Sequence, residues 1–558
     1  MREYNYKKEY KNWKWNIPDN LNIGYDCVDK HTKTDKKNKI ALYWEDSEGN
    51  TDKFTYNDMK RLTNKFGNVL KNLGFKKDDR FLIRLPNLPE FQISFLGGVK
   101  IGAIPIPSSV MFRAHEIEYR VNDSSSKALI TTSKYVKQVN EIRDKCPSLE
   151  DIIIVGEAYD DQLEYDELMK DGSSNLDIEP TKKDDMAFFC YTSGTTGSPK
   201  GTVHLHQWVA GNDPSVLFWQ DAKDDDILAH TGDLNWIFPL GNGFLYPWRH
   251  GFSTFIYDGR FHPEKWYQLL EKYKISVLAS VPTAYRMFVA VKDADKKYDL
   301  SNLRHCMSAG EPLNPEVIKK WKRLFNLDLY DGIGMTEIMV YLSNIPGMKI
   351  KPGSCGKPQP GKVCEIVDHE GKPVKQGEPG ALAVKQTDPG LFKEYWNKPN
   401  KTSKSFKNGW FLTGDVLYQD EEGYYWFSGR DDDLIMAAGY RISPFEVESA
   451  IISHPDVLEC AVVASPNEIR GVLVKAFVIL HDMSKASDDL VKDIQEHTKK
   501  VAAPYKYPRE IEFVDELPKT QSGKIKRRMF QSLKKKALLV FLDRVHLVMT
   551  LLILLKRM

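Results

Sequence analysis

The chain has 558 residues, with 79 Lys and Arg against 77 Asp and Glu, so its formal net charge is +2. Hydrophobic residues make up 41% and charged residues 28%, a composition that excludes a disordered chain, a collagen-like chain and a polytopic membrane protein. The small net charge also argues against a protein that binds nucleic acid through bulk positive charge, and we expect no nucleic-acid partner. The length is enough for about three or four domains or subdomains.

The N-terminal segment and the cysteines indicate the compartment. Residues 1–20 lack the apolar stretch of a signal peptide and contain acidic residues, which transit peptides avoid. The seven cysteines are scattered, odd in number and form no CxxC pair. This argues against zinc ribbons and a disulfide framework and favours a reducing compartment. We therefore expect a cytoplasmic protein.

From about residue 53 to residue 291, helical and strand-like segments alternate. The pattern predicts an amphipathic helix over 56–73, a strand over 80–85, a helix over 90–98 and a buried strand over 103–107. Short runs of apolar and β-branched residues follow, as is typical of parallel strands buried on both faces, at 128–131, 151–155 and 276–280. This alternation predicts an α/β fold with more than one sheet.

The pattern changes after Gly353. Closely spaced Gly and Pro between short strands predict an antiparallel, β-barrel-like subdomain over 353–384. After the charged stretch 429–433 comes a unit of about 100 residues with a small α+β pattern: helices over 444–455 and 487–501, and strands over 459–466 and 472–480. We place the boundary near Asp432, which gives an N-terminal domain of residues 1–431, with two α/β subdomains and the β subdomain, and a C-terminal domain of residues 432–558.

The C-terminal tail, residues 537–558, is apolar but interrupted by charges. Its longest uncharged run, Leu547 to Leu555, is far shorter than the roughly 18–20 residues of a membrane span. The tail therefore predicts a packed or loosely ordered helix and no transmembrane span. A peripheral membrane contact is the alternative.

The most informative stretch is YTSGTTGSPKG, residues 191–201. Its glycines let backbone amides turn toward an anion, its Ser and Thr hydroxyls add donors, and Lys200 adds charge, so the stretch predicts a loop that binds phosphate. It follows an apolar segment, 186–190, which we expect to be the strand that presents the loop. A solvated Gly/Ser/Thr turn is the alternative. The loop is not a Walker A motif, because Pro199 stands where that motif needs Gly.

Three other stretches partly match known binding motifs. Residues 356–362 have GxxxxGK spacing, but Val363 replaces the required Ser or Thr, and we interpret this stretch as a turn of the β subdomain. Gly332-Ile-Gly334 lacks the third glycine of a dinucleotide fingerprint. His204 and His206 would share one face of a strand, but no Cys, Asp or Glu adjoins them, and we predict no metal site there.

Seven motifs occur in an order that resembles one family. Over about residues 50–530 the chain is similar to the AMP-forming acyl-CoA synthetases of the acyl-adenylating superfamily. The matching motifs are YTSGTTGSPKG (191–201), SAGEPL (308–313), YDGIGMTE (330–337), TGD (413–415), GRDDD (429–433), AGYR (438–441) and PKTQSGK (518–524).

The resemblance implies the ATP site. Thr336 and Glu337 would bind Mg²⁺, which prefers hard oxygen ligands, and would take part in catalysis; a Thr–Glu pair without this context would be interpreted as a helix start. Asp415, expected at a tight turn, would accept hydrogen bonds from the ribose hydroxyls, and Arg430 and Arg441 would bind phosphate oxygens. The remaining ATP-binding residues would be Thr192, Ser193, Gly194, Thr195, Thr196, Gly197, Ser198, Pro199, Lys200, Gly310, Glu311, Pro312, Asp331, Gly332, Ile333, Gly334 and Met335.

The resemblance also implies a two-step reaction. Carboxylic acid and ATP would give acyl-AMP and pyrophosphate, with the ammonium group of Lys524 lowering the electrostatic cost of the anionic reaction. The C-terminal domain would then rotate about the hinge residue Asp432, and coenzyme A would take the acyl group. Residues that would bind coenzyme A are Ala438, Gly439, Tyr440, Arg470, Lys499 and Tyr507. We expect the neighbouring Lys526, Arg527 and Arg528 to be solvated surface.

The branch is narrower than the superfamily. Residues 503–520 and 437–441 most resemble the medium-chain acyl-CoA synthetases, followed by acetyl-CoA synthetases. Trp236 would form the floor of the acyl pocket or, alternatively, fill core. Short- to medium-chain carboxylates, including branched and aromatic ones, are the expected substrates; the preferred acid and the oligomeric state are left open.

The chain departs from the family pattern at two positions, and two other functions are alternatives. Ala438 stands where the family often has Ser, and Asp431 gives three consecutive acids at the hinge. One alternative is an enzyme of the same fold that loads a carrier protein. The other is a nucleotide-binding or membrane-associated regulatory protein that has lost catalysis, against which the intact Lys524 motif argues.

Overall fold

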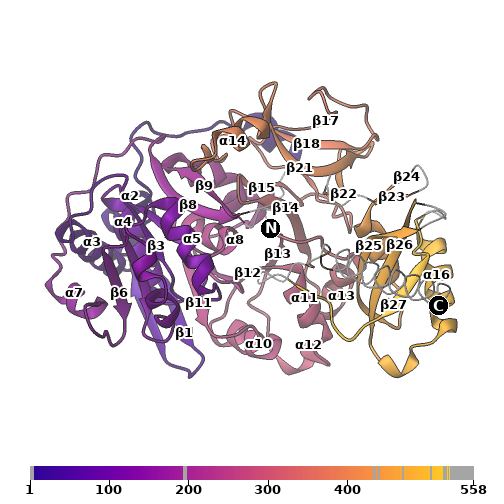
Figure 1. The fold of residues 1–558 in the computed structure, drawn as a ribbon, viewed down its shortest axis with the longest axis horizontal. Coiled ribbons are helices and arrows are strands. Elements are labelled where there is room, and N and C mark those ends of the chain that lie inside the picture. The colour runs from indigo at the N-terminus through magenta and orange to yellow at the C-terminus, as the bar shows by residue number, and fades with distance from the viewer. Residues whose placement is uncertain are drawn as a thin grey trace, which may run out of the picture. The chain divides into compact units, whose positions relative to one another are not determined.

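The computed structural model describes residues 5–192, 198–430, 435–437, 440–467, 471–502 and 506–519, with Ile525, Arg527 and Met529; for Tyr440, Arg441 and Gly471 it describes the backbone only. Contacts between Cα atoms divide the chain into two compact units. Unit 1 comprises Met1–Gly377, Leu382–Thr413 and Gln419–Trp426; unit 2 comprises Glu378–Ala381, Gly414–Tyr418 and Phe427–Met558. Both units mix helices and strands (Figure 1), which confirms the α/β prediction.

A nine-stranded sheet forms the centre of unit 1. Its inner strands pair in parallel, and β14 and β15 form an antiparallel hairpin toward one edge. In order the strands are β16 (Lys357–Pro358), β15 (Met339–Ser343), β14 (Leu329–Met335), β13 (His305–Ser308), β12 (Val277–Ser280), β10 (Ile227–His230), β11 (Ser253–Asp258), β1 (Ile40–Asp46) and β2 (Thr51–Thr55).

Both faces of this sheet are buried. On β12, Val277 and Ala279 enter one hydrophobic cluster while Leu278 enters another, because successive side chains of a strand point to opposite faces. The second cluster is completed by helices α10 (Pro263–Lys272), α11 (Pro282–Ala290) and α13 (Pro315–Phe325). The predicted buried parallel strand at 276–280 is confirmed.

A second, fully parallel sheet carries the helices predicted near the N-terminus. Its strands are β4 (Ile104–Pro107), β3 (Arg80–Ile83), β5 (Ala128–Thr132), β6 (Asp151–Val155) and β7 (Leu163–Glu164). Helices α3 (Tyr56–Asn72) and α4 (Pro89–Lys100) pack with Phe81 and Ile83, whereas α5 (Ala114–Ser124) packs with Leu82 of the same strand. The predictions are confirmed, although the strand expected over 80–85 ends at Ile83.

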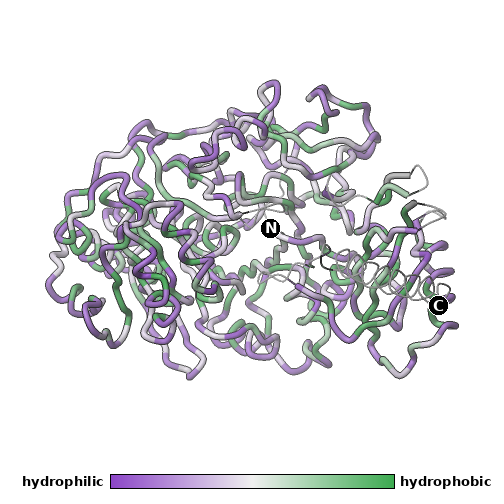
Figure 2. The backbone as a smooth tube through the Cα atoms, viewed as in Figure 1, coloured by the Kyte–Doolittle hydropathy of each residue, from purple (hydrophilic) through white to green (hydrophobic). Residues whose placement is uncertain are grey.

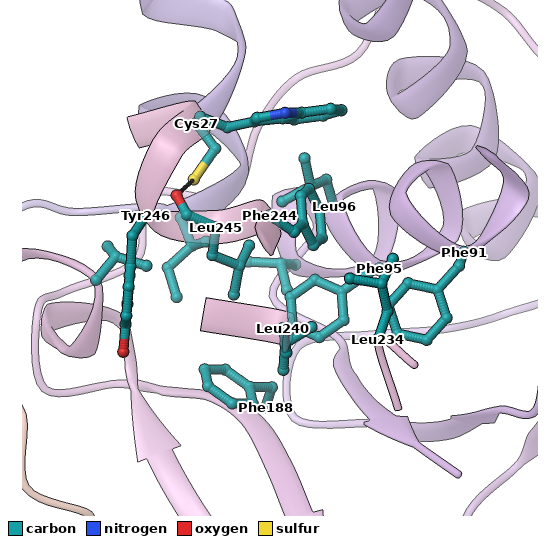
Figure 3. Close-up of a cluster of buried hydrophobic side chains, with 14 of the residues drawn as sticks. Cys27, Phe91, Phe95, Leu96, Phe188, Leu234, Leu240, Phe244, Leu245 and Tyr246 are labelled. Atoms are coloured by element: carbon teal, nitrogen blue, oxygen red, sulfur yellow. Dashed lines mark hydrogen bonds between the residues drawn. The ribbon is translucent and has the colours of Figure 1, made fainter. Parts of the chain in front are cut away.

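A three-stranded sheet presents the predicted phosphate loop. Strands β8 (Met186–Thr192) and β9 (Lys200–Leu205) are antiparallel, and β19 (Glu394–Tyr395) pairs with β9. Figure 3 shows Phe188 of β8 in a buried cluster with Phe95 of α4 and Leu240; the rings of Phe188 and Phe95 are 5.6 Å apart. This core fixes the strand that leads into the loop.

The expected β subdomain is a five-stranded sheet. Its strands are β17 (Cys364–Val367), β18 (Gly380–Lys385), β21 (Trp410–Gln419), β20 (Phe406–Lys407) and β22 (Tyr425–Arg430), the last paired with β21. The boundaries between the two units fall within three of these strands, β18, β21 and β22. Residues 356–362 differ from expectation, because β16 belongs to the large sheet and only the stretch that follows it is a turn. The buried ammonium of Lys362 pairs with Asp388 at 2.8 Å.

Unit 2 holds the predicted small α+β structure. Strand β25 (Val457–Asn467) is antiparallel to β26 (Gly471–Leu480), which pairs in parallel with β27 (Glu510–Phe513). Helices α15 (Pro444–Ile452) and α16 (Asp488–Val501) share one hydrophobic core with these strands. Strands β23 (Ile435–Ala437) and β24 (Tyr440–Ile442) form a separate antiparallel ribbon.

Hydropathy follows this architecture. Figure 2 shows hydrophobic residues concentrated in the inner strands and hydrophilic residues on the outer helices and loops of each unit. All seven cysteines are buried and unbridged. Within the described residues, no helix has the length and apolar character needed to cross a membrane. The tail at 537–558 lies outside the described residues.

Candidate active site

The carboxyl ends of four parallel strands meet at one edge of the large sheet. His230 of β10 pairs with Ala279 of β12, Ser280 with Ser308 of β13, and Ser308 with Asp331 of β14. Ligands of open α/β sheets bind at this edge. The predicted motifs at 308–313 and 330–337 therefore lie next to each other, although residues 314–329 separate them in the chain.

Two carboxyl groups at this edge each keep one buried oxygen without a hydrogen-bond partner in the protein. Thr283 donates a hydrogen bond of 2.8 Å to Glu311 Oε2, whereas Glu311 Oε1 has no hydrogen-bond partner. Asp331 is buried, its Oδ1 is also without a partner, and burial raises its pKa well above the ordinary value. Unsatisfied buried acceptors are costly, so these oxygens suit a ligand that offers hydrogen-bond donors.

Glu337 lies in the turn between β14 and β15, so Thr336 and Glu337 do not begin a helix. The side chain of Glu337 is buried, and the hydroxyl of Tyr395 donates a 2.7 Å hydrogen bond to its Oε1. Lys200 Nζ lies 4.0 Å from the centroid of the same tyrosine ring. The structure thus brings together Lys200 and Glu337, predicted from separate motifs, through Tyr395, which the sequence analysis missed.

Helix α5 holds the two ends of the phosphate loop. Tyr191, before the loop, donates a 2.8 Å hydrogen bond to Asp123 Oδ2, and Tyr119 donates one of 2.9 Å to the carbonyl of Pro199, after the loop. Lys398 pairs with the other oxygen of Asp123 at 3.0 Å. Neither Tyr119 nor Asp123 belongs to a recognisable motif. Residues 193–197 of the loop lie outside the described residues.

The segment that contains Trp236 is positioned by hydrogen bonds of Asn235. Asn235 donates a 2.7 Å hydrogen bond to the carbonyl of Leu85 and accepts one of 3.0 Å from the amide of Ser108. These bonds tie the segment to the ends of β3 and β4. Trp236 itself is half-buried, and its ring meets that of Phe112 edge-on at 6.1 Å.

In unit 2, Asp415 and Arg430 form an ion pair of 2.9 Å, and the carboxylate is largely buried. Asp415 lies within the long strand β21 and not at the expected tight turn. Gly414 before it has φ +77°, and a Cβ there would approach Arg430 Nη2 to 2.8 Å. Glycine therefore permits both the positive φ within the strand and the close approach of the arginine.

Described residues on either side of Lys524 have partners within unit 2. Lys519 and Ile525 form an antiparallel bridge, and Arg527 donates to both carboxylate oxygens of Glu448 at 2.8 and 2.7 Å. The expectation that Arg527 is solvated surface is wrong, because a bidentate pair with the buried Glu448 holds it. The remaining predicted residues outside the described part are Lys524, Asp432, Ala438, Gly439 and Arg470.

A group of cations and one aromatic ring lies on unit 2. Lys499 Nζ is 4.3 Å from the ring centroid of Tyr507, and Arg509 donates a 2.6 Å hydrogen bond to the Tyr507 hydroxyl. Sequence reasoning named Lys499 and Tyr507 but missed Arg509, which follows them on an exposed turn. Tyr440 and Arg441 lie on β24, where Arg441 pairs with Met436.

The two histidines of the HLH stretch do not share a strand face. His204 lies on β9 and stacks on Phe188 at 4.7 Å, whereas His206 begins a 3₁₀ turn and accepts a hydrogen bond from the amide of Ile23. Burial lowers the pKa of each to about 3. Over the described part of the chain, no three His, Cys, Asp or Glu side chains gather as an all-protein metal site.

Two family models and several known proteins match this chain. The AMP-binding enzyme family matches residues 29–396, and the AMP-binding enzyme C-terminal domain matches residues 446–524. Acetyl-coenzyme A synthetase of Bacillus subtilis is 40% identical over 95% of each chain. Mitochondrial acyl-coenzyme A synthetase ACSM3 of Rattus norvegicus is 39% identical over 94% of this chain and 92% of its own length.

A solved structure extends the likeness to three dimensions. The anthranilate CoA ligase AuaEII in complex with anthranoyl-AMP superposes with a TM-score of 0.86 at 32% identity, covering 93% of this chain and 98% of that one. Family match, sequence relatives and fold therefore agree. The chain belongs to the AMP-binding enzyme family and, within it, to the AMP-forming acyl-CoA synthetases.

Proposed function

We propose that this acyl-CoA synthetase activates short- to medium-chain carboxylic acids, including branched and aromatic ones, through an acyl adenylate. The main support for adenylate formation is the arrangement of Lys200, Tyr395 and Glu337. It places a cation and a carboxylate beside the phosphate loop. Such a pair suits the phosphates of ATP and their metal ion. Acetyl and anthranoyl substrates of the relatives support the range of acids.

Within this proposal, three groups of residues would contact ATP. The phosphates would lie on residues 192–200, and the base would lie along Gly310–Pro312 and residues 331–335, where Glu311 and Asp331 offer unpartnered oxygens. Asp415, oriented by Arg430, would accept the ribose hydroxyls. Arg441 would bind phosphate oxygens.

The side chains of Thr336 and Glu337 suit Mg²⁺ chemically. Magnesium prefers one or two protein oxygens with substrate phosphates and waters to an all-protein cage, and the described residues offer such a partial set. When bound, the ion neutralises charge on the phosphate oxygens. Glu337 would hold it with the oxygen oriented by Tyr395.

The reaction follows from these positions. A carboxylate oxygen of the acid attacks the α-phosphorus of ATP, the bond to the bridging oxygen breaks, and pyrophosphate leaves. Lys524 would stabilise the charge that accumulates on the phosphoryl oxygens. Residues 432–558 would then turn about Asp432 relative to residues 1–431, a gating step, and the thiol of coenzyme A would displace AMP while losing its proton. Residues 438–440, Arg470, Lys499 and Tyr507 would contact coenzyme A.

The acceptor can be tested directly. The cationic group around Tyr507 favours the nucleotide of coenzyme A over a carrier protein, because cations and an aromatic face suit phosphates and a base. We expect mass spectrometry to detect acyl-CoA from a mixture that offers ATP, an acid, coenzyme A and a phosphopantetheinylated carrier protein. Transfer to the carrier alone would contradict this choice of acceptor.

Replacing Trp236 by alanine is expected to shift the preferred acid toward longer chains. Removing the indole would deepen the pocket, and each methylene then accommodated is worth about 1–3 kcal/mol. We expect kcat/KM for an eight-carbon acid, relative to a four-carbon acid, to rise about tenfold or more in a pyrophosphate-release assay. An unchanged ratio in a folded variant would assign Trp236 to the core alone.

Replacing Asp123 by asparagine is expected to raise the KM for ATP about tenfold, because a charged hydrogen bond is worth about 1.5–3 kcal/mol. The substitution weakens the bond to Tyr191 before the loop. It also removes the charge that holds Lys398, which donates to the Tyr119 hydroxyl, so the contact after the loop loses support as well. Asp79→Asn, which breaks the Asp79–Lys127 pair elsewhere in unit 1, is the control and should leave the KM unchanged. Equal KM values in both variants would contradict the role of Asp123.

A further inference from the structure

Tyr395 occupies a junction between three parts of the candidate site. It is one of the two residues of β19, which pairs with β9 next to the phosphate loop, with Tyr395 opposite Thr202. Its side chain is 4% exposed, and its ring packs on that of Phe392 at 4.7 Å. The amide of Tyr395 donates a 3.0 Å hydrogen bond to Thr402. The position of this side chain is therefore fixed from the backbone outward.

The side chain contacts two opposite charges with two different parts. Its hydroxyl donates to Glu337 Oε1 at 2.7 Å, and its ring lies 4.0 Å from the ammonium of Lys200. An aromatic ring has a negative face and a positive edge, so the face attracts a cation while the O–H suits an anion. Tyr395 thereby gives Lys200 and Glu337 a common partner.

We infer that Tyr395 is a positioning residue, which orients Glu337 toward the metal ion and Lys200 toward the phosphates of the nucleotide. The inference rests on the proposed function. Magnesium demands near-ideal octahedral geometry, so a ligand whose rotamer is already fixed binds it better. Outer partners of metal ligands commonly account for about 10- to 100-fold in metal affinity.

The two contacts can be separated by substitution. Tyr395→Phe removes the hydroxyl and keeps the ring face for Lys200, whereas Tyr395→Leu removes both. Tyr267→Phe is the matched control, because it also removes a buried tyrosine hydroxyl, one that donates to the carbonyl of Phe288 away from the site. Thermal melting of each variant reports whether it is folded.

The measurement is Mn²⁺ binding by electron paramagnetic resonance, with the full chain and α,β-methylene-ATP, which cannot transfer its adenylyl group to an acid. We expect Tyr395→Phe to raise the Kd of Mn²⁺ about 10- to 100-fold, while binding of the analogue in EDTA stays at the wild-type value. Tyr395→Leu should weaken both, and Tyr267→Phe should change neither. A Kd of Tyr395→Phe equal to that of the wild type would overturn the inference.

A double-variant cycle tests whether Tyr395 acts through Glu337. Once Glu337→Ala has removed the ligand and the acceptor of the Tyr395 hydroxyl, adding Tyr395→Phe should weaken Mn²⁺ binding no further. Additive losses would overturn the positioning role. Tyr395→Phe alone leaves the buried Glu337 carboxylate without its hydroxyl donor, which could lower the melting temperature. The double variant has no carboxylate at position 337, so it can still be measured if the single variant is unstable. A wild-type chain that releases no pyrophosphate with any acid would instead contradict the proposed function itself.

Discussion

Replacing Lys524 by alanine is expected to lower the rate of acyl-adenylate formation by about 100- to 1,000-fold, the usual cost of removing one group that stabilises transition-state charge. Thioester formation from supplied acyl-AMP should stay near the wild-type rate. In that step the thiol of coenzyme A attacks the carbonyl carbon of acyl-AMP, and no bond to phosphorus forms or breaks. The bridge of Lys519 to Ile525 and the pair of Arg527 with Glu448 should survive, because the substitution changes none of these residues.

The two half-reactions are measured separately, adenylation as acid-dependent pyrophosphate release and thioesterification as acyl-CoA formed from acyl-AMP. Lys519→Ala is the control, because it removes a neighbouring cation that pairs with Glu459. It should retain most of the adenylation rate. Equal loss of both half-reactions in Lys524→Ala would contradict the proposed alternation of the C-terminal domain.

Replacing Glu337 by glutamine is expected to lower the rate of adenylation at ordinary Mg²⁺ concentration by about 100-fold. Loss of a residue that only contacts a metal ligand commonly costs about 10- to 100-fold, and loss of the ligand itself should cost at least as much. The amide keeps the size of the side chain and can still accept from Tyr395, but it lacks the charge that Mg²⁺ prefers. Raising the Mg²⁺ concentration should restore part of the activity.

The dependence on magnesium distinguishes this variant from Lys524→Ala, whose defect should persist at every Mg²⁺ concentration. Glu316→Gln, which removes a half-exposed carboxylate on α13, is the control and should leave the magnesium dependence unchanged. A Glu337→Gln enzyme with the same magnesium requirement as the wild type would remove Glu337 from the metal site.

Local patterns predicted the elements well, for physical reasons. Strands β5, β6 and β12 are buried on both faces, so their positions appear as short β-branched runs. Helix α3 shows one apolar face because only that face packs on the sheet. Likewise, residues 186–190 were predicted as the strand before the phosphate loop because an apolar run precedes the glycines.

Long-range contacts could not be predicted. Tyr395 lies 58 residues from Glu337, and Asp123 lies 68 residues from Tyr191, so no spacing rule connects them. Arg527 looked like part of a solvated basic run because its partner Glu448 is 79 residues earlier. These partners meet only because sheets and helices bring distant segments together.

Pyrophosphate release with a panel of carboxylic acids, measured with and without coenzyme A, tests the central claim most directly. We expect short- to medium-chain acids to give acid-dependent pyrophosphate in the absence of coenzyme A, up to about one equivalent per enzyme, and continuous turnover when it is added. Failure of every acid to release pyrophosphate from ATP, with or without coenzyme A, would contradict the assignment of this chain as an acyl-adenylate-forming ligase.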